Sequence, residues 1–245
     1  MTSEAAVSVS GGYGSGPGPI ALVGSGEFLP QMVEIDRFLL DGRVARAAFL
    51  PTAAGEEGHR SFQHWLELGR AHYEAMGVEA VPVPIVTAAD ANDPAMVEGL
   101  TDVGLIYLSG GNPGYLAATL RGSLAWNMIV TRWKAGVALA GCSAGAGALT
   151  AVAPDVRGRR FNEPGLGLIP DLAVIPHYDK MIGWDPGFAT RMTAQLPAGA
   201  HMVGIDEDTA LVGGPTQWTV MGRQSVHILS GTAGIFQSGE ELTFT

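Results

Sequence analysis

A single serine lies among small residues in the stretch AGCSAGAGAL, residues 140–149. Gly141 to Gly145 fit the pattern G-x-S-x-G, in which a serine occupies a sharp turn between a strand and a helix. The apolar residues VALA precede the pattern, and AGAGAL follows the serine. Small neighbours are needed because the backbone folds tightly there, and the N-terminus of the following helix favours a developing oxyanion. Ser143 is therefore the candidate nucleophile of an acyl transfer.

Two other interpretations of this stretch stay open. A glycine-rich turn can pack a helix against a strand while its serine does no chemistry. Cys142 is a second possible nucleophile, but it stands one place before the middle of the pattern, so we expect it to point into the protein. A free cysteine is more often a buried small hydrophobic residue than a reactive thiol.

A serine nucleophile needs a base, and the base needs an orienting group. His177 directly follows the apolar run LAVIP and is the first residue of the polar stretch HYDK. We therefore place it at a strand end, where a base is expected. A structural histidine is the equally weighted alternative. The other five are expected in strands (His201, His227) or on the surface of a helical stretch (His59, His64, His72).

Carboxylates at two places are candidates for the orienting group. Asp206, Glu207 and Asp208 follow the predicted strand HMVGI, and Glu163 lies in the predicted loop NEPGLG. The first cluster is also compatible with a polar turn, and Glu163 with a solvated loop charge. The residue pattern alone leaves the choice open.

The elements around these residues alternate between short apolar runs and stretches with helical spacing. This alternation predicts an α/β fold with a mainly parallel sheet. The strand–loop junctions at Gly24, Pro51, Gly110 and Cys142 are then expected at the carboxyl edge of the sheet, where open α/β sheets bind their ligands.

After Val152 the pattern changes to short β-like runs separated by turn residues. We expect a β-rich C-terminal third packed on the same sheet, in which TALVGG, QWTVMG and SVHILSG form an antiparallel meander. Residues 20–245 are predicted to form a single α/β domain. Residues 1–19 are rich in Gly, Ser and Pro and are expected to be a flexible lead-in.

Composition excludes several classes of function. The formal net charge of −10 disfavours nucleic-acid binding, because phosphate backbones are repelled. The single cysteine excludes an intramolecular disulfide and a Cys-rich zinc site. No apolar run approaches the roughly 20 residues that span a bilayer, and the first residues lack the features of a signal peptide, so we expect a soluble, cytoplasmic protein without membrane partners.

Several segments in a fixed order resemble the aspartyl dipeptidase (peptidase E) and cyanophycinase family of serine peptidases. The resemblance implies a fold like that of class I glutamine amidotransferase domains: a three-layer α/β sandwich with a mainly parallel central sheet and a β-rich C-terminal third. The matching segments are FLPTAA, YLSGGNPGYLAATL, GCSAGA, GLGLIP with IPHY, and VGIDEDTALV.

The resemblance implies a Ser-His-Glu triad in this chain order. The nucleophile is then Ser143 and the base His177, and the acid is Glu207, the third residue after the glycine of GIDED. Backbone N–H groups of Ala144 and of Gly110 or Gly111 are implied as the oxyanion hole. The implied mechanism needs no metal ion and no organic cofactor. The expected partner is a small peptide or amide, and a homodimer is a further expectation.

The chain departs from the cyanophycinase pattern in two places. Pro113 stands in GGNP where cyanophycinases typically have glutamine, and I-P-H-Y-D-K replaces their D-Q-H-F stretch. These departures favour a dipeptidase-like substrate. Dipeptidases of the family recognise an acidic first residue, which calls for a basic partner. Arg191 is a candidate, although a helix-surface arginine is the favoured interpretation; Lys180 is a second, and Asn112 a further candidate for substrate contact.

Two alternative functions remain at this point. A non-catalytic binding or regulatory protein could retain the same fold, but the complete set of triad residues disfavours it. An amidotransferase-like enzyme that hands ammonia to a partner would need a cysteine at the position of Ser143.

Overall fold

The structure is a computed structural model that describes residues 16–155, 160–196, 198–214 and 216–244. Most of the predicted lead-in, residues 1–15, lies outside the described residues. The chain is already anchored at Gly18, whose N–H donates to the carbonyl of Trp133 and whose carbonyl accepts from the Trp133 indole, both at 2.8 Å. No helix in the described ranges is long and apolar enough to cross a bilayer.

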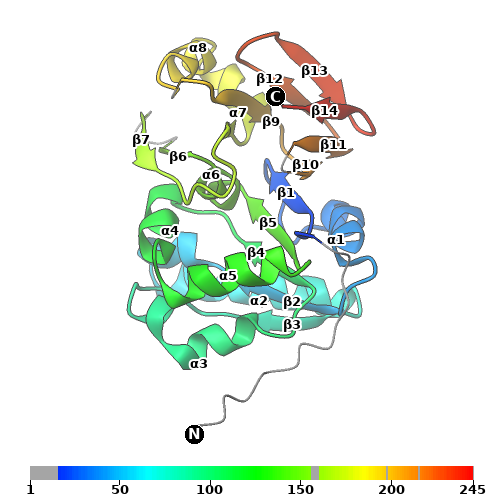
Figure 1. Cartoon of the computed structure of the whole chain (residues 1–245), viewed down its shortest axis with the longest axis vertical. Helices are drawn as coiled ribbons and strands as arrows, with labels where there is room; N and C mark the ends of the chain where they lie inside the picture. The colour runs from blue at the N-terminus through cyan, green and yellow to red at the C-terminus, as the bar shows by residue number, and fades with distance from the viewer. Residues whose placement is uncertain (1–15, 156–159, 197, 215, 245) are drawn as a thin grey trace, which may run out of the picture.

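A mixed sheet of eight strands forms the centre of the molecule (Figure 1). Five neighbouring strands are parallel, as the alternation of strands and helices predicts. Three strands from the C-terminal third extend the sheet in antiparallel orientation. In spatial order the strands are β14 (Glu241–Thr243), β11 (Gln217–Gly222), β10 (Thr209–Gly213), β1 (Ile20–Val23), β5 (Ala138–Cys142), β4 (Leu105–Leu108), β2 (Arg46–Leu50) and β3 (Glu79–Pro82).

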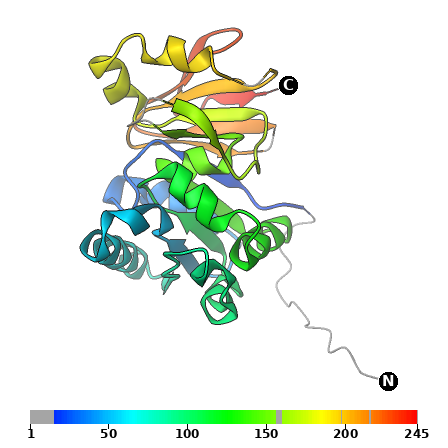
Figure 2. The ribbon, with the colours of Figure 1, turned by 90° about the vertical axis from the view of Figure 1, so that its left-hand side faces the viewer.

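Helices cover both faces of the parallel part and complete the predicted three layers (Figure 2). Alternate strand residues point to opposite faces, so the four consecutive buried residues of β1 contribute to two separate apolar clusters. One face packs on α1 (Val33–Leu40) and α2 (His59–Ala75). The other packs on α3 (Pro94–Val97), α4 (Pro113–Leu120), α5 (Leu124–Lys134) and α6 (Ala144–Leu149).

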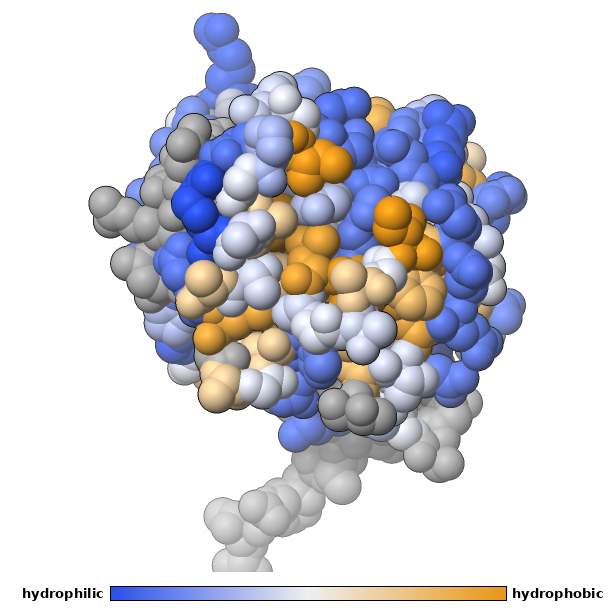
Figure 3. All heavy atoms as spheres, turned by 90° about the horizontal axis from the view of Figure 1, so that it is seen from above, coloured by the Kyte–Doolittle hydropathy of each residue, from blue (hydrophilic) through white to orange (hydrophobic). Residues whose placement is uncertain are grey.

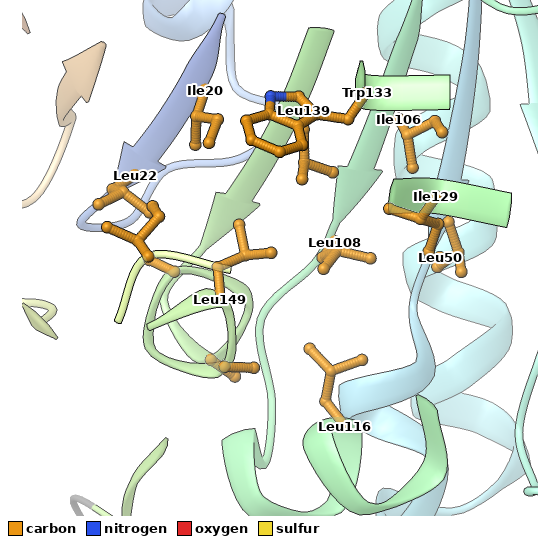
Figure 4. Packing of buried hydrophobic residues seen from close by; sticks show 14 of the residues in the cluster. Ile20, Leu22, Leu50, Ile106, Leu108, Leu116, Ile129, Trp133, Leu139 and Leu149 are labelled. Carbon is orange, nitrogen blue, oxygen red and sulfur yellow. The ribbon is translucent and has the colours of Figure 1, made fainter. Parts of the chain in front are cut away.

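The second of these clusters fixes the helices that lie beside the site. Figure 4 shows Leu108 of β4 and Leu139 of β5 among the leucines and isoleucines of this layer, with Leu149 of α6 close by. These side chains are fully buried. Burial of one such leucine contributes about 1.5–3 kcal/mol, so the short helix α6 is held by packing more than by its own propensity.

A second sheet of four strands, in the order β13 (Gly234–Gln237), β12 (Ser225–Ile228), β9 (His201–Ile205) and β8 (Leu172–Ile175), forms the upper part of the molecule in Figure 1. The predicted meander is therefore wrong in its third strand. SVHILSG, which contains β12, pairs with β9 and β13 instead of β11, because β14 occupies the free edge of β11 and Gly222, at φ +114°, redirects the chain.

Two short helices, α7 (Tyr178–Trp184) and α8 (Phe188–Thr193), pack on this second sheet through their own apolar cluster. A hairpin of β6 (Val152–Asp155) and β7 (Arg160–Pro164) connects the two halves along the chain. Seen from above, in Figure 3, apolar residues lie among polar ones at this end. Trp184 and Ile235 are its most exposed large apolar side chains, at 79% and 64%.

Candidate active site

Ser143 occupies a sharp turn between β5 and α6, as the sequence pattern predicts. Its backbone, at φ 50° and ψ −105°, lies in a region that residues with a side chain rarely adopt. The neighbouring glycines are required by space: a Cβ on Gly141 would lie 2.5 Å from the backbone of Gly145, and a Cβ on Gly145 2.2 Å from the carbonyl of Leu108. The turn is further held by a hydrogen bond from the Ser143 N–H to the carbonyl of Val23 (2.9 Å).

The side chains of Ser143, His177 and Glu207 form a hydrogen-bonded series. Ser143 Oγ lies 3.0 Å from His177 Nε2, and His177 Nδ1 lies 3.0 Å from Glu207 Oε1. With a proton on Nδ1, the imidazole donates to the carboxylate and accepts from the serine hydroxyl. This arrangement suits a hydroxyl that must lose its proton during attack on a carbonyl.

His177 reaches this position because it adopts a left-handed backbone conformation (φ 51°, ψ 37°) between β8 and α7. It stands two residues beyond the end of β8, close to the predicted strand end. Its side chain is 38% exposed and that of Glu207 is 31% exposed. The series is therefore accessible to a ligand while one side of it packs on the protein.

The three carboxylates at 206–208 point to different partners. Asp206 is buried, and its Oδ2 accepts from the N–H of Ser225 (3.2 Å) and contacts His227 Nε2 (3.0 Å). Asp208 accepts from Gln31 Nε2 at 3.1 Å. Only Glu207 of this group contacts His177. The fourth candidate, Glu163, is exposed on β7, and its side chain lies beside Gly114 of α4.

A small charged network surrounds Glu207. Its N–H donates to Asp179 Oδ1 (3.0 Å), and Lys180 Nζ lies 3.2 Å from Asp179 Oδ2 and 3.5 Å from Glu207 Oε2. Burial acts to raise the pKa of Asp179, but the Glu207 N–H and the Lys180 ammonium outweigh it and lower that pKa. The hydrogen bond with Asp179 and the nearby carboxylates raise the pKa of Lys180, so this lysine stays charged beside the series.

One of the predicted oxyanion groups is already engaged in a hydrogen bond. A Cβ on Gly110 would lie 3.5 Å from Ser143 Cβ, which places the glycine loop next to the serine. The Gly110 N–H, however, donates to the buried carboxylate of Glu27 (2.8 Å). This contact disfavours Gly110 as the predicted oxyanion donor. Ala144 is the first residue of α6, so its N–H belongs to the first turn of the helix.

The two residues expected to touch substrate have structural partners. Asn112 caps α4 by accepting from the Tyr115 N–H (3.1 Å), and its amide donates to Glu56 (2.9 Å). Arg191 is exposed on α8 and forms an ion pair with Asp185, in agreement with the interpretation as a helix-surface arginine. Both side chains therefore already have hydrogen-bond or ion-pair partners within the protein.

Two buried polar groups test expectations from the sequence. Cys142 points inward, as predicted, and its thiol donates to Glu27 Oε2 (2.7 Å). Burial, and secondly the Glu27 carboxylate, raise the pKa of this thiol well above its usual value, which disfavours Cys142 as a nucleophile. The prediction that His72 lies on the surface is wrong: it is buried against the sheet, with Nε2 2.7 Å from Asp36 Oδ2.

Sequence reasoning missed Glu27 and misplaced His72. Glu27 lies in the loop GSGEF directly after β1, at the carboxyl edge of the sheet, and this position was a usable signal. His72 lies three residues after the buried Gly69 and one before the buried Tyr73, on the apolar side of α2. No group of three or more His, Cys, Asp or Glu side chains within the described ranges is arranged to hold a metal ion.

Comparison with known proteins gives matches over most of the chain. The model of peptidase family S51 matches residues 20–219. A peptidase from an acI-B1 Actinobacterium, known from its crystal structure, is 38% identical with a TM-score of 0.87, and the match covers 95% of this chain and 99% of that one. No curated protein matches the sequence.

A more distant structural match shows the fold alone. It is a candidate peptidase E protein from Listeria monocytogenes EGD-e, 18% identical with a TM-score of 0.64, and the match covers 85% of this chain and 100% of that one. The mainly parallel central sheet with added antiparallel strands agrees with this likeness.

Proposed function

Because the chain belongs to peptidase family S51, it is a serine-type peptidase, and we propose that it hydrolyses a small peptide or amide through an acyl-enzyme on Ser143. The family contains the aspartyl dipeptidases and the cyanophycinases. The proposal names His177 as general base and Glu207 as the group that orients and stabilises it.

In the proposed reaction, His177 Nε2 takes the Ser143 proton while Oγ attacks the carbonyl carbon of the substrate. Glu207 holds the proton on Nδ1 and stabilises the imidazolium that forms. The N–H groups of Gly111 and Ala144 receive the negative charge of the tetrahedral oxygen. His177 then gives its proton to the leaving amine, and a water molecule repeats the sequence to release the acid. Each proton is carried by His177, so no step calls for a metal ion or an organic cofactor.

One observation carries this proposal, the two consecutive 3.0 Å contacts from Ser143 to His177 and from His177 to Glu207. The strained backbone at Ser143 gives independent support. Such conformations cost on the order of 1–3 kcal/mol, persist where the surrounding structure holds them, and cluster at active sites. A structural glycine turn with an incidental serine would have no need of a strained residue that also faces a histidine.

For the substrate, we propose a dipeptide or similarly short peptide in preference to cyanophycin. The proposal rests on Pro113, which closely follows the glycines Gly110 and Gly111 and is the first residue of α4. Proline offers neither an N–H group nor a polar side chain to the substrate. A library of dipeptides with acidic, basic and neutral first residues, assayed beside cyanophycin, tests it. Cleavage of cyanophycin faster than of every dipeptide would contradict the proposal.

Fluorophosphonate labelling followed by intact mass measurement tests the nucleophile. We expect one adduct on the wild type and none on Ser143→Ala. Ser109→Ala is the matched control, because Ser109 ends the run after β4 and its hydroxyl is buried without a hydrogen-bond partner, so this variant should label like the wild type. An adduct on Ser143→Ala, or no adduct on the wild type, would refute the assignment.

A further inference from the structure

A buried carboxylate outside the proposed triad joins the two segments on which the reaction depends. Glu27 is 7% exposed. Its Oε1 accepts from the N–H of Gly110, in the loop after β4, at 2.8 Å. Its Oε2 accepts from the thiol of Cys142, the residue before the nucleophile, at 2.7 Å. A buried carboxylate is costly unless its oxygens are hydrogen-bonded, and here each oxygen has one donor.

The backbone around Glu27 is arranged to aim its side chain inward. Gly26 and Phe28 on either side have φ of 92° and 63°. A left-handed conformation is costly for a residue with a ring, but Phe28 is buried in a cluster with Phe49, Tyr73 and Tyr107. The aromatic contacts hold the strained turn, and the turn delivers the carboxylate.

Gly110 is shaped to receive this carboxylate. A Cβ at this position would lie 2.6 Å from Glu27 Oε1 and 3.5 Å from Ser143 Cβ, so Glu27, Gly110 and Ser143 are in successive contact. Any larger residue would push the carboxylate away from the amide.

The contact also completes the anchoring of the glycine pair. On the C-terminal side of Gly111, the N–H of Asn112 donates to the carbonyl of Ala53 (2.8 Å). On the N-terminal side, the corresponding anchor is the Gly110 N–H on Glu27. Gly111, at φ 137°, therefore lies between two fixed amides. Loss of the Glu27 anchor frees one side of a segment that has no side chains of its own to hold it.

We propose that Glu27 is a positioning residue. It ties the loop that contains Gly110 and Gly111 to the turn at Ser143, so that the Gly111 and Ala144 N–H groups stay at a fixed separation from Ser143. This inference deepens the proposed function and rests on it. This role assigns Glu27 no contact with the substrate or with the reacting oxygen, because its carboxylate binds the Gly110 N–H and the Cys142 thiol. Its effect should appear in the rate of reaction more than in binding, because the oxyanion forms only during reaction.

Four variants separate this role from general stability. Glu27→Gln keeps an oxygen for the Gly110 N–H, whereas Glu27→Met keeps the volume and removes both acceptors. Cys142→Ala removes only the donor on the nucleophile side. Asp36→Asn is the control for loss of a buried carboxylate, because Asp36 is also buried, at 1% exposure, but contacts His72 instead of the site.

The first measurement is the labelling rate of each folded variant with a fluorophosphonate, resolved into kinact and KI. A displacement of about 1 Å costs on the order of 100-fold in rate, so we expect kinact of Glu27→Met to fall by about 10- to 100-fold with KI changed by less than about threefold. Glu27→Gln should recover most of this loss. Cys142→Ala should lie between Glu27→Gln and Glu27→Met, and Asp36→Asn should lower only the thermal midpoint.

The second measurement is hydrogen exchange of the segment 108–113, which does not depend on chemistry. We expect faster exchange in Glu27→Met than in the wild type or Asp36→Asn. A kinact within about threefold of wild type, or unchanged exchange, in Glu27→Met would overturn the inference, as would an equal loss of kinact in Asp36→Asn. If the wild type does not label at all, the proposed function fails and the effect on rate with it; the exchange result then still decides whether Glu27 anchors the loop.

Discussion

Replacement of Glu207 by glutamine probes the contact between the carboxylate and His177. The substitution keeps the size of the side chain and an oxygen that can accept from Nδ1–H, but it removes the negative charge. In the wild type that charge lies beside the ring, with Oε1 3.0 Å from Nδ1. The imidazolium formed during proton transfer therefore loses its counter-charge in the variant.

The expected loss follows from this distance and from the exposure of the pair. Two unit charges about 4 Å apart attract by about 1 kcal/mol in water and about 4 kcal/mol at an effective dielectric constant of 20. Because the two side chains are 38% and 31% exposed, an intermediate value applies. About 2–3 kcal/mol corresponds to a loss of about 30- to 160-fold in kcat/KM. The ammonium of Lys180, 3.5 Å from Glu207 Oε2, keeps its charge and increases the loss.

The assay is kcat/KM on a cleaved dipeptide, corrected for active sites by fluorophosphonate titration. Glu163→Gln is the matched control, since it makes the same chemical change at an exposed carboxylate and should alter kcat/KM by less than about twofold. Lys180→Met in the Glu207→Gln background should restore part of the rate by removing the unpaired cation. A loss of less than about threefold in Glu207→Gln, or a larger loss in Glu163→Gln, would refute the assignment of the carboxylate.

Two further predictions concern groups outside the series. The lowered pKa of Asp179 means that its carboxylate stabilises the fold above its usual value of 3.8, and that this contribution is lost as the pH falls through the lowered pKa. Asp179→Asn should therefore unfold more easily than wild type at pH 7, with the difference in urea midpoint disappearing as the pH falls through the lowered pKa. A difference that stays constant with pH would contradict this. His72→Ala leaves the Asp36 carboxyl buried without its partner and should destabilise the protein by about 3–5 kcal/mol without changing kcat per labelled site. His64→Ala, exposed on the same helix, should change stability by less than about 0.5 kcal/mol, and equal effects of the two would refute the structural role of His72.

The parallel half of the fold could be predicted because its signals are local. The four residues Ile20–Val23 are all apolar and all buried, as expected for a strand covered on both faces. The turn at Ser143 could also be predicted, because the tight backbone requires small residues and all of them lie within five positions of the chain. Topology then brings the ends of β1, β2, β4 and β5 to one edge.

The pattern alone could not choose among the three carboxylates, and the error in the predicted meander has the same origin. The direction of Asp206 is set by β12, which donates the Ser225 N–H and the His227 ring to it. Because Asp206 is held on that side, Glu207 is free to turn toward His177. The paired residues of β12 and β9, from Val226 with Ile205 to Ile228 with Val203, are more than twenty positions apart, so no local pattern predicts this pairing.

The burial of polar residues could not be predicted from the sequence for a different reason. Hydropathy assigns a glutamate or a histidine to the surface, because the cost of burying either is high in the absence of a partner. Glu27 is buried with its partners Gly110 and Cys142, and His72 is buried with its partner Asp36. These partners come from segments that are distant in the sequence, so the sequence alone does not show that they meet. Only the three-dimensional structure brings these groups together.

Most of the residues with a strained backbone lie at or next to residues of the proposed site. Five non-glycine residues in the described part of the chain have positive φ, and four of them are Ser143, His177, Phe28 after Glu27, and Asp208 after Glu207. Each costs on the order of 1–3 kcal/mol unless its surroundings hold it.

The loop that follows β1, with the 3-10 helix Pro30–Met32 at its end, contains one of these four positions and contacts the turns of two others. Glu27 on this loop binds Gly110 and the residue before Ser143, Phe28 lies on it, and Gln31 binds Asp208 at 3.1 Å. The loop also begins where the N–H of Gly24 donates to the carbonyl of Thr209 (2.9 Å). It therefore connects the nucleophile turn, the glycine loop and the carboxylate turn, three segments that the chain delivers from separate strands. A change in this loop is expected to alter the geometry of the site at several points at once.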